Sequence, residues 1–296
     1  MAGAFCMIID SHAHAWQTYP YRQPVPDPHS RTRVEQLIYE MNSCGVDRAI
    51  LITASIDRNP DNNMYVADAV IQFPERLYHF PDVDCEWSST YHTQGAASRL
   101  EETIHRWQQY NQRDSYCLKG FTHYLAYQDE GDWLYSSEGL DFFRTAAECQ
   151  LILSICCYPH QHKALRKMAE KVPNLPILVH HLGLVKANET PPRSQLQQVL
   201  ESAQLPNIYV KISGFGYASS VKWGFPYQDV TPIVLEIYEK YGPYRMCWGS
   251  DYPVVRDFMT YRQSLEVFRS FYSAIPEQDK EWILGKTILK LLSPAE

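Results

Sequence analysis

Histidine and aspartate residues stand where three apolar runs of the sequence turn polar. The run that ends in "DSHAHAW" contains His12 and His14. The run "PILVHHLG" contains His180 and His181, and "MCWGSDYPV" leads into Asp251. Neutral imidazoles and carboxylates can share one divalent metal ion at about 2 Å, or can move protons between water and a substrate. These residue types therefore indicate either a metal site or an acid–base site.

The spacing of these residues predicts which side chains converge. Because side chains alternate along a strand, His12 and His14 would leave the same face of one strand at its end. The same alternation lets only one of the neighbours His180 and His181 point inward, and we expect this to be His181, with His180 packed or at the surface. A carboxylate such as Asp251 needs a cation, a donor or a proton-transfer role to offset its desolvation. Hydrogen-bonded histidines and a capping aspartate are the structural alternatives.

Short β-rich runs alternate with segments of helical period along the whole chain, and these elements must position the polar residues. The predicted strands are Met7–Asp10, Ala49–Ala54, Leu77–Val83, Cys117–Thr122, Leu151–Cys157, Ile177–His181, Ile208–Ser213 and Met246–Gly249. The predicted helices are Thr32–Cys44, Met64–Phe73, Ala97–Gln109, Leu140–Cys149, His162–Lys171, Ser194–Ala203 and Thr231–Tyr241, with two more after the last strand. This rhythm predicts an α/β protein, a single (β/α)8 TIM barrel over residues 1–296. An open doubly wound sheet is the alternative, which the absence of Gly-x-Gly-x-x-Gly after the first strand disfavours.

Loops at the mouth of such a barrel indicate what the protein binds, because catalytic groups of barrels lie at the C-terminal ends of the strands. Arg58 follows the second strand and Arg256 follows the eighth. Guanidinium groups pair well with carboxylates, so both are candidate contacts for a small acidic molecule, with a solvated surface charge as the alternative. Trp16 is a candidate wall for stacking a substrate ring.

Composition excludes several other classes of protein. The formal net charge of -7 and the absence of Lys/Arg runs argue against a nucleic-acid partner. No apolar stretch approaches the roughly 20 residues of a membrane span, and the N-terminus is a poor secretory signal, so we expect no membrane partner and a cytoplasmic location. The eight cysteines lack a Cys-x-x-Cys spacing, which favours reduced thiols.

The motifs "DSHAHAW", "MNSCGVDRAILI", "FPERLYHFPDVD", "VHHLG", "YVKISG" and "GSDYPV" together resemble those of the amidohydrolase superfamily, in the amidohydrolase 2 branch. The resemblance runs nearly from end to end. Within that branch the chain looks most similar to the lactonase group, which includes sugar-acid lactonases and 2-pyrone-4,6-dicarboxylate lactonase.

The resemblance implies hydrolysis of a small carbonyl substrate, a lactone of a sugar acid or carboxylic acid. Asp251 would be the general base toward water and later the acid toward the leaving oxygen. His12, His14 and His181, together with Asp251, would bind one divalent metal ion, Zn or Mn, or the histidines would polarise the carbonyl directly. Metal-free hydrolysis stays open. A homodimer is the oligomeric state that we expect of such a barrel.

The chain also departs from the resemblance. Many metal-dependent relatives carry a histidine at the end of strand five, where this chain reads "ILSICCYPHQH". Tyr158 is then a candidate for orienting substrate, and Cys157 is a remoter candidate ligand. In "CLKGFTHYL", Lys119 and His123 are assigned structural or substrate-binding roles. A metal-dependent decarboxylase of a small unsaturated acid and a non-catalytic binding barrel are the alternative functions.

Overall fold

The computed structural model describes residues 7–21, 25–110, 118–189 and 193–293. Its eight strands are β1 (Ile9–Ala13), β2 (Arg48–Ile52), β3 (Leu77–Phe80), β4 (Gly120–Tyr124), β5 (Ile152–Cys156), β6 (Ile177–Val179), β7 (Ile208–Ile212) and β8 (Met246–Trp248). The helices of those ranges are α1 (Val34–Cys44), α2 (Asn62–Gln72), α3 (Ala96–Tyr110), α4 (Ser137–Glu148), α5 (His162–Lys171), α6 (Ser194–Glu201), α7 (Phe215–Ala218), α8 (Thr231–Tyr241), α9 (Tyr261–Phe271), α10 (Glu277–Glu281) and α11 (Thr287–Leu292). Each predicted strand and helix has a counterpart in these lists. Cys117, at the start of the fourth predicted strand, lies outside the described residues.

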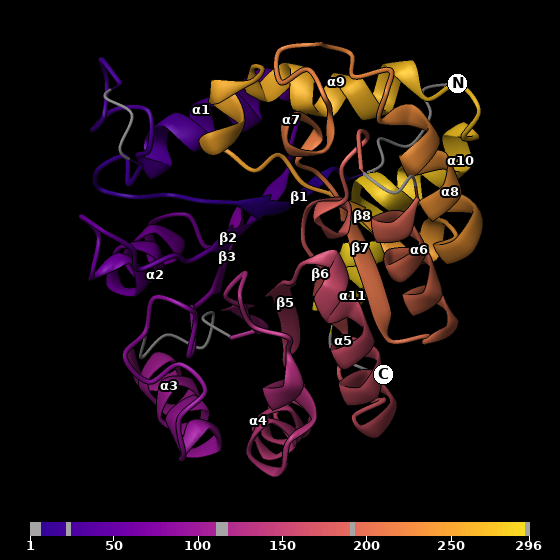
Figure 1. The fold of residues 1–296 in the computed structure, drawn as a ribbon. Helices are drawn as coiled ribbons and strands as arrows, with labels where there is room; N and C mark the ends of the chain where they lie inside the picture. The colour runs from indigo at the N-terminus through magenta and orange to yellow at the C-terminus, as the bar shows by residue number, and fades with distance from the viewer. Residues whose placement is uncertain (1–6, 22–24, 111–117, 190–192, 294–296) are drawn as a thin grey trace.

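The strands follow one another around a ring in chain order. β1, β2 and β3 form one parallel sheet, and β4 to β8 form a second. Single parallel bridges, Ala13 to Tyr252 and Asp82 to Thr122, join the two sheets at both junctions. The helices lie around the outside of the strands (Figure 1). This arrangement confirms the predicted (β/α)8 barrel, because a doubly wound sheet would reverse its strand order instead of continuing around a ring.

Side-chain alternation separates the interior of the barrel from the layer beneath the helices. Ile50, Ile152 and Leu178 belong to an apolar cluster inside the ring, which Ile288 of α11 joins. Outward residues such as Leu153 belong to the larger cluster that includes the residues buried on the helices. The strand ends therefore lie above a filled interior, as in other barrels of this kind.

Strand β1 differs most from its prediction. The sequence predicts a strand over Met7–Asp10, whereas pairing with β2 carries β1 to Ala13, with a register shift between Asp10 and Ala13. His12 consequently lies within the strand instead of following it. None of the helices in the described ranges combines the length and the apolarity that a membrane crossing requires.

Two buried histidines outside the barrel mouth predict a loss of stability in acid. Burial lowers the pKa of His79 to about 3, and burial together with Arg166 lowers the pKa of His162 to about 3. The unfolded chain takes up protons at both positions below pH ~6.5, whereas the folded chain keeps them neutral until about pH 3. The free energy of unfolding should therefore fall below pH ~6.5, by about 1.4 kcal/mol per pH unit for each group.

Thermal unfolding followed by circular dichroism between pH values of about 7.5 and 5 measures this slope. His79→Gln should make the slope shallower, and His105→Gln, at an exposed position of α3, should leave it unchanged. Equal slopes in the wild type and in His79→Gln would contradict the assignment.

Candidate active site at the barrel mouth

His12 and His14 converge at the end of β1, as their spacing predicts. Their Nε2 atoms lie 3.2 Å apart, and both side chains are buried. The Nδ1 atom of His14 lies 2.6 Å from the carbonyl oxygen of Ile52, so Nδ1–H donates there and Nε2 keeps its lone pair. Trp16 stacks on the imidazole of His14 at 4.7 Å between ring centroids and further fixes the ring.

Asp251 reaches the same point from the end of β8. Its Oδ1 atom lies 3.6, 3.4 and 3.9 Å from the Nε2 atoms of His12, His14 and His181, respectively. Its backbone N–H donates to the carbonyl of His12 at 2.8 Å, which ties the end of β8 to β1. The structure thus brings together all four residues that the sequence assigns to a metal or acid–base centre.

The charge of Asp251 is stabilised inside the site. Burial by itself would raise the pKa of the carboxyl, but His181, His14 and a hydrogen bond from Tyr217 outweigh burial and lower the pKa below its ordinary value. The Tyr217 hydroxyl donates to Oδ2 at 2.5 Å. The carboxylate is therefore ionised at neutral pH, and its Oδ1 faces the histidines while Oδ2 is held by Tyr217.

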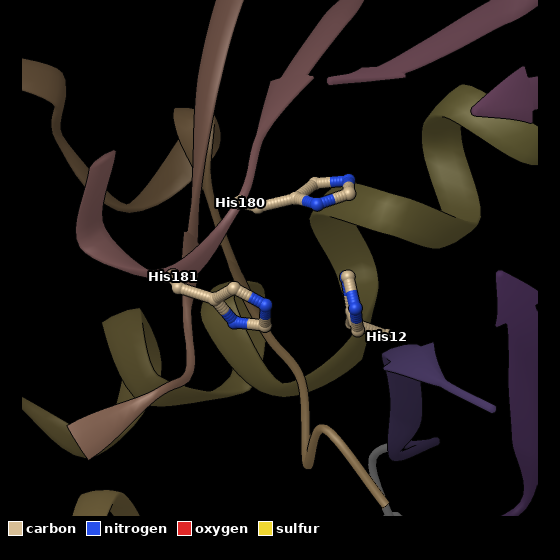
Figure 2. A group of neighbouring side chains, drawn as sticks. All are labelled: His12, His180 and His181. Atoms are coloured by element: carbon tan, nitrogen blue, oxygen red, sulfur yellow. The ribbon is translucent and has the colours of Figure 1, made fainter. Parts of the chain in front are cut away.

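Both His180 and His181 point into the site, so the expectation that only His181 points inward is wrong. His180 is fully buried, but in the site and not away from it. Figure 2 shows the rings of His12, His180 and His181 turned toward one common space. The ring centroids of His12 and His180 lie 4.5 Å apart, and those of His12 and His181 lie 4.6 Å apart. Strand alternation fails here because β6 ends at Val179 and His181 adopts a positive φ of 46°, which turns the second ring to the same side. Burial is the main reason why the pKa of His181 falls to about 4 and that of His180 falls well below its ordinary value.

Lys211 of β7 is a component of the site that the sequence analysis missed. Its side chain is fully buried, and its Nζ atom donates to Ser154 Oγ at 2.6 Å and lies 3.2 Å from His12 Nδ1. Burial lowers the pKa of Lys211 to about 7, against the opposing effects of Cys247, Asp10 and Asp251. A lysine inside the apolar run "IYVKI" was the available sign, because alternation places it on the interior face of the strand. Tyr217, on the short helix α7, gave no comparable sign.

The spacing of the donor atoms suits a single metal ion. Nε2 of His12, Nε2 of His14 and Oδ1 of Asp251 are separated by 3.2 to 3.6 Å. Ligand atoms at about 2.0–2.1 Å from a tetrahedral ion are ~3.3 Å apart, so these three atoms need only small shifts to share one ion. His181 Nε2 lies 3.9 Å from the same oxygen, but within a 4.8 Å limit its ring nitrogen groups with those of His12 and His180 and not with His14.

The chain matches a known protein family over most of its length. The family model described as Amidohydrolase (Amidohydro_2) matches residues 9–293. The chain belongs to this amidohydrolase family. The protein is accordingly an enzyme of amidohydrolase-related type, and the non-catalytic alternative is set aside.

Solved structures share the fold of this amidohydrolase. An amidohydrolase from Burkholderia multivorans with bound Zn has a TM-score of 0.76 and 17% sequence identity, covering 97% of this chain and 99% of that chain. A probable 2-pyrone-4,6-dicarboxylic acid hydrolase from Acinetobacter baumannii with citric acid bound has a TM-score of 0.73 and 18% identity, covering 96% and 98%. A curated relative from Sinorhizobium fredii, "Uncharacterized protein y4mH", is 24% identical over 144 residues. That match spans 49% of this chain and 48% of the relative.

The five predicted substrate contacts of the amidohydrolase occupy different surroundings. Trp16 is fully buried beside His14, and its indole N–H donates to the carbonyl of Ala54 at 2.9 Å. Tyr158 is half-buried, and its ring packs edge-on against Tyr127 at 4.9 Å. The substrate-binding roles of Trp16 and Tyr158 stay predictions.

The two arginines are both exposed, and Arg256 lies close to a carboxylate. Arg58 is exposed on the loop after β2. Arg256 is also on the surface, where its Nη2 atom lies 3.7 Å from a carboxylate oxygen of Asp27. A substrate carboxylate at Arg256 would therefore compete with Asp27, and both arginine contacts remain predictions.

His123 lies in a second cluster outside the ring, beneath the helices. Its Nδ1 atom lies 3.0 Å from the carbonyl oxygen of Val83, and its Nε2 atom lies 3.3 Å from His92 Nε2. Phe142 and Phe143 of α4 surround the ring. No contact with the barrel-mouth histidines is recorded for His123 within the described residues, because the side chain leaves β4 on the outward face with Phe121.

The end of β5 carries Cys156 inward and Cys157 outward. Cys157 belongs to the layer beneath the helices, with its Sγ atom 3.8 Å from His162 Nε2. The suggestion that Cys157 is a ligand is therefore wrong, because strand alternation turns it away from Asp251. Cys156 occupies the inward position instead, and burial raises the pKa of its thiol well above the ordinary value.

A pocket of ≈ 610 Å³ opens above the site. Its lining includes Tyr21, Tyr217, Lys222 and Trp223. Tyr217 also holds Asp251, so one residue connects the pocket to the carboxylate. The pocket has the volume of a small-molecule site.

Proposed function

We propose that this amidohydrolase hydrolyses a lactone of a sugar acid or another carboxylic acid, with Asp251 as the general base. The observation that carries the proposal is the position of the Asp251 carboxylate. It is buried and ionised, its Oδ1 faces three imidazole nitrogens, and its Oδ2 is fixed by Tyr217. A fixed carboxylate beside imidazole rings suits the proton transfers of carbonyl hydrolysis.

The same residues fit one divalent metal ion, which we propose is Zn or Mn. His12, His14, His181 and Asp251 would hold it. The donor atoms of His12, His14 and Asp251 have the spacing described above, and His181 would have to move closer to complete the set. A bound metal ion would supply Lewis-acid polarisation and lower the pKa of water. His14 need not give up a proton to act as a ligand at Nε2, because its Nδ1–H is donated to the carbonyl oxygen of Ile52.

The protein groups would move protons in two stages. Asp251 accepts a proton from water as the water oxygen forms its bond to the lactone carbonyl carbon. When the ring C–O bond breaks, the protonated Asp251 returns that proton to the leaving alkoxide oxygen. The product is a hydroxy acid, and its ionised carboxyl releases one proton to the solvent.

The pocket suits a small ring, and its lining carries one cation and one carboxylate. Lys222 supplies the cation and Asp257 the carboxylate, while aromatic side chains supply surface for the ring. Arg58 and Arg256 are further candidate cations for a carboxylate at the rim.

Proton release with a pH indicator, over a panel of sugar-acid and dicarboxylate lactones, tests the proposed reaction. We expect release above background from at least one lactone. We also expect the rate to fall after dialysis against a chelator and to return on adding Zn or Mn, with metal content measured in parallel. An undiminished rate in metal-free protein would contradict the metal assignment but keep the hydrolysis. Evolution of CO2 from unsaturated acids, without proton release from any lactone, would replace hydrolysis with decarboxylation.

A further inference from the structure

His180 has a buried ring nitrogen that the proposed chemistry does not yet use. The side chain is fully buried, and its Nδ1 atom has no hydrogen-bond partner among the described residues. A buried polar group without a partner costs about 1–3 kcal/mol, so its retention at the barrel mouth calls for a ligand.

The opposite nitrogen of His180 is held by a short chain of hydrogen bonds. Lys211 Nζ donates to Ser154 Oγ at 2.6 Å, and Ser154 Oγ lies 2.7 Å from His180 Nε2. Lysine has an N–H for Ser154 whether it is an ammonium or an amine. One lone pair of the Ser154 oxygen therefore accepts from lysine. Among the described residues, His180 Nε2 is the group positioned to accept the Ser154 O–H. His180 Nε2 is then an acceptor, so the hydrogen of the neutral ring is on Nδ1.

The ring of His180 shares a small space with two other histidines of the site. His12, His180 and His181 each offer a ring nitrogen, and these three nitrogens lie within 4.8 Å of one another. The centre of three nitrogens no more than 4.8 Å apart is at most ~2.8 Å from each, so one substrate oxygen placed there would be within hydrogen-bond reach of all three. Figure 2 shows the three rings around this space.

We propose that His180 donates its Nδ1–H to the carbonyl oxygen of the substrate, and that Ser154 and Lys211 are positioning residues that keep the hydrogen on Nδ1. The inference rests on the proposed hydrolysis and adds a residue to it. The carbonyl oxygen gains negative charge as water adds, and a fixed donor stabilises that charge more than it stabilises the ground state. His180 would therefore act on kcat more than on KM.

Two substitutions of His180 distinguish the effect of the N–H donor from the effect of losing the imidazole ring. His180→Asn retains an N–H near the position of Nδ1, whereas His180→Leu removes it. We expect kcat of His180→Leu to fall about 100-fold or more and that of His180→Asn to fall clearly less, with KM nearly unchanged in both. Ser154→Ala should lie between the wild type and His180→Leu, because the tautomer is no longer fixed. If the leucine variant does not fold, the asparagine and Ser154→Ala variants carry the test.

Metal content distinguishes a donor from a ligand. The bound metal per chain should be the same in the wild type, His180→Asn and His180→Leu. Loss of metal on substitution of His180 would overturn the proposal, since His180 would then be a metal ligand. An unchanged kcat in His180→Leu would overturn it as well.

Nitrogen NMR of the ¹⁵N-histidine-labelled protein tests the tautomer without any substrate. The His180 signals, assigned by their loss in His180→Asn, should show a protonated Nδ1 and an unprotonated Nε2, and this pattern should change in Ser154→Ala. A hydrogen on Nε2 overturns the inference even if lactones are hydrolysed. Absence of lactone turnover in the wild type, with Nδ1–H observed, rejects the proposed hydrolysis and leaves the hydrogen-bonded relay supported.

Discussion

Asp251→Asn should lower kcat at least ~1,000-fold with little change in KM, within the range that general acid–base catalysis contributes. The amide is nearly the same size as the carboxylate and can still accept the Tyr217 hydrogen bond at one oxygen. It cannot accept a proton from water, and it removes the negative charge that faces His12, His14 and His181. Steady-state kinetics on the best lactone of the panel measures the effect.

Two control variants test whether the loss of activity is specific to the Asp251 carboxylate. Tyr217→Phe leaves the carboxylate in place but frees Oδ2, so kcat should fall only about 10-fold, as expected for loss of one orienting hydrogen bond. Asp141→Asn makes the same chemical change on the exposed surface of α4 and should leave kcat unaltered. If Asp251→Asn kept wild-type turnover while folded by circular dichroism, another group would have to be the base.

Lys211→Met should combine a loss of activity with a gain in stability. Burial lowers the pKa of Lys211 to about 7 from an ordinary 10.5, which corresponds to roughly 5 kcal/mol of destabilisation at pH 7. Methionine is similar in length and needs no hydration, although Ser154 and His12 lose a donor at a cost of about 1–3 kcal/mol. We therefore expect the free energy of unfolding to rise by about 2 kcal/mol at pH 7. The gain should shrink as the pH rises toward 10.5, because the unfolded lysine then also loses its proton.

Activity should move in the opposite direction. Lys211 contacts Ser154 and the Nδ1 atom of His12, so its removal frees two rings of the site from their fixed orientation. A fall of kcat of about 100-fold is expected, typical of losing preorganised polar groups. Denaturant unfolding and kinetics on the same preparation test both halves, and Lys240→Met, at an exposed position of α8, is the matched control. A variant that is less stable than the wild type, or equally active, would contradict the prediction.

The local sequence pattern was sufficient to predict the strands and helices and the main residues of the candidate active site. Period-two alternation predicted that His12 and His14 converge, and their Nε2 atoms lie 3.2 Å apart. Apolar runs that end in polar residues predicted the positions of Asp251 and His181 at the barrel mouth. These patterns are informative because a strand in a closed barrel has one interior face. An inward polar residue at the C-terminal end of such a strand therefore lies at the barrel mouth.

Strand alternation gave a wrong prediction for His180, because the backbone is no longer a strand at that position. β6 ends before His180, and a left-handed residue at His181 turns two consecutive rings into one space. Positive φ at a histidine is set by packing of the following turn, including the close approach of Gly214, where an added Cβ would lie 2.7 Å from His181 Cβ. A single sequence contains no pattern that reports such a contact.

The sequence by itself determined that the chain forms eight parallel strands with crossover helices, and that histidines and an aspartate lie at the C-terminal strand ends. Both follow from periodicity, which is local. Only the tertiary structure decided that Lys211, Ser154 and His180 form one buried chain, that Tyr217 holds the base, and that His123 belongs to the outer layer. Those outcomes depend on distances between strands far apart in sequence, and on burial, which sets the charge of each group through the loss of water around it.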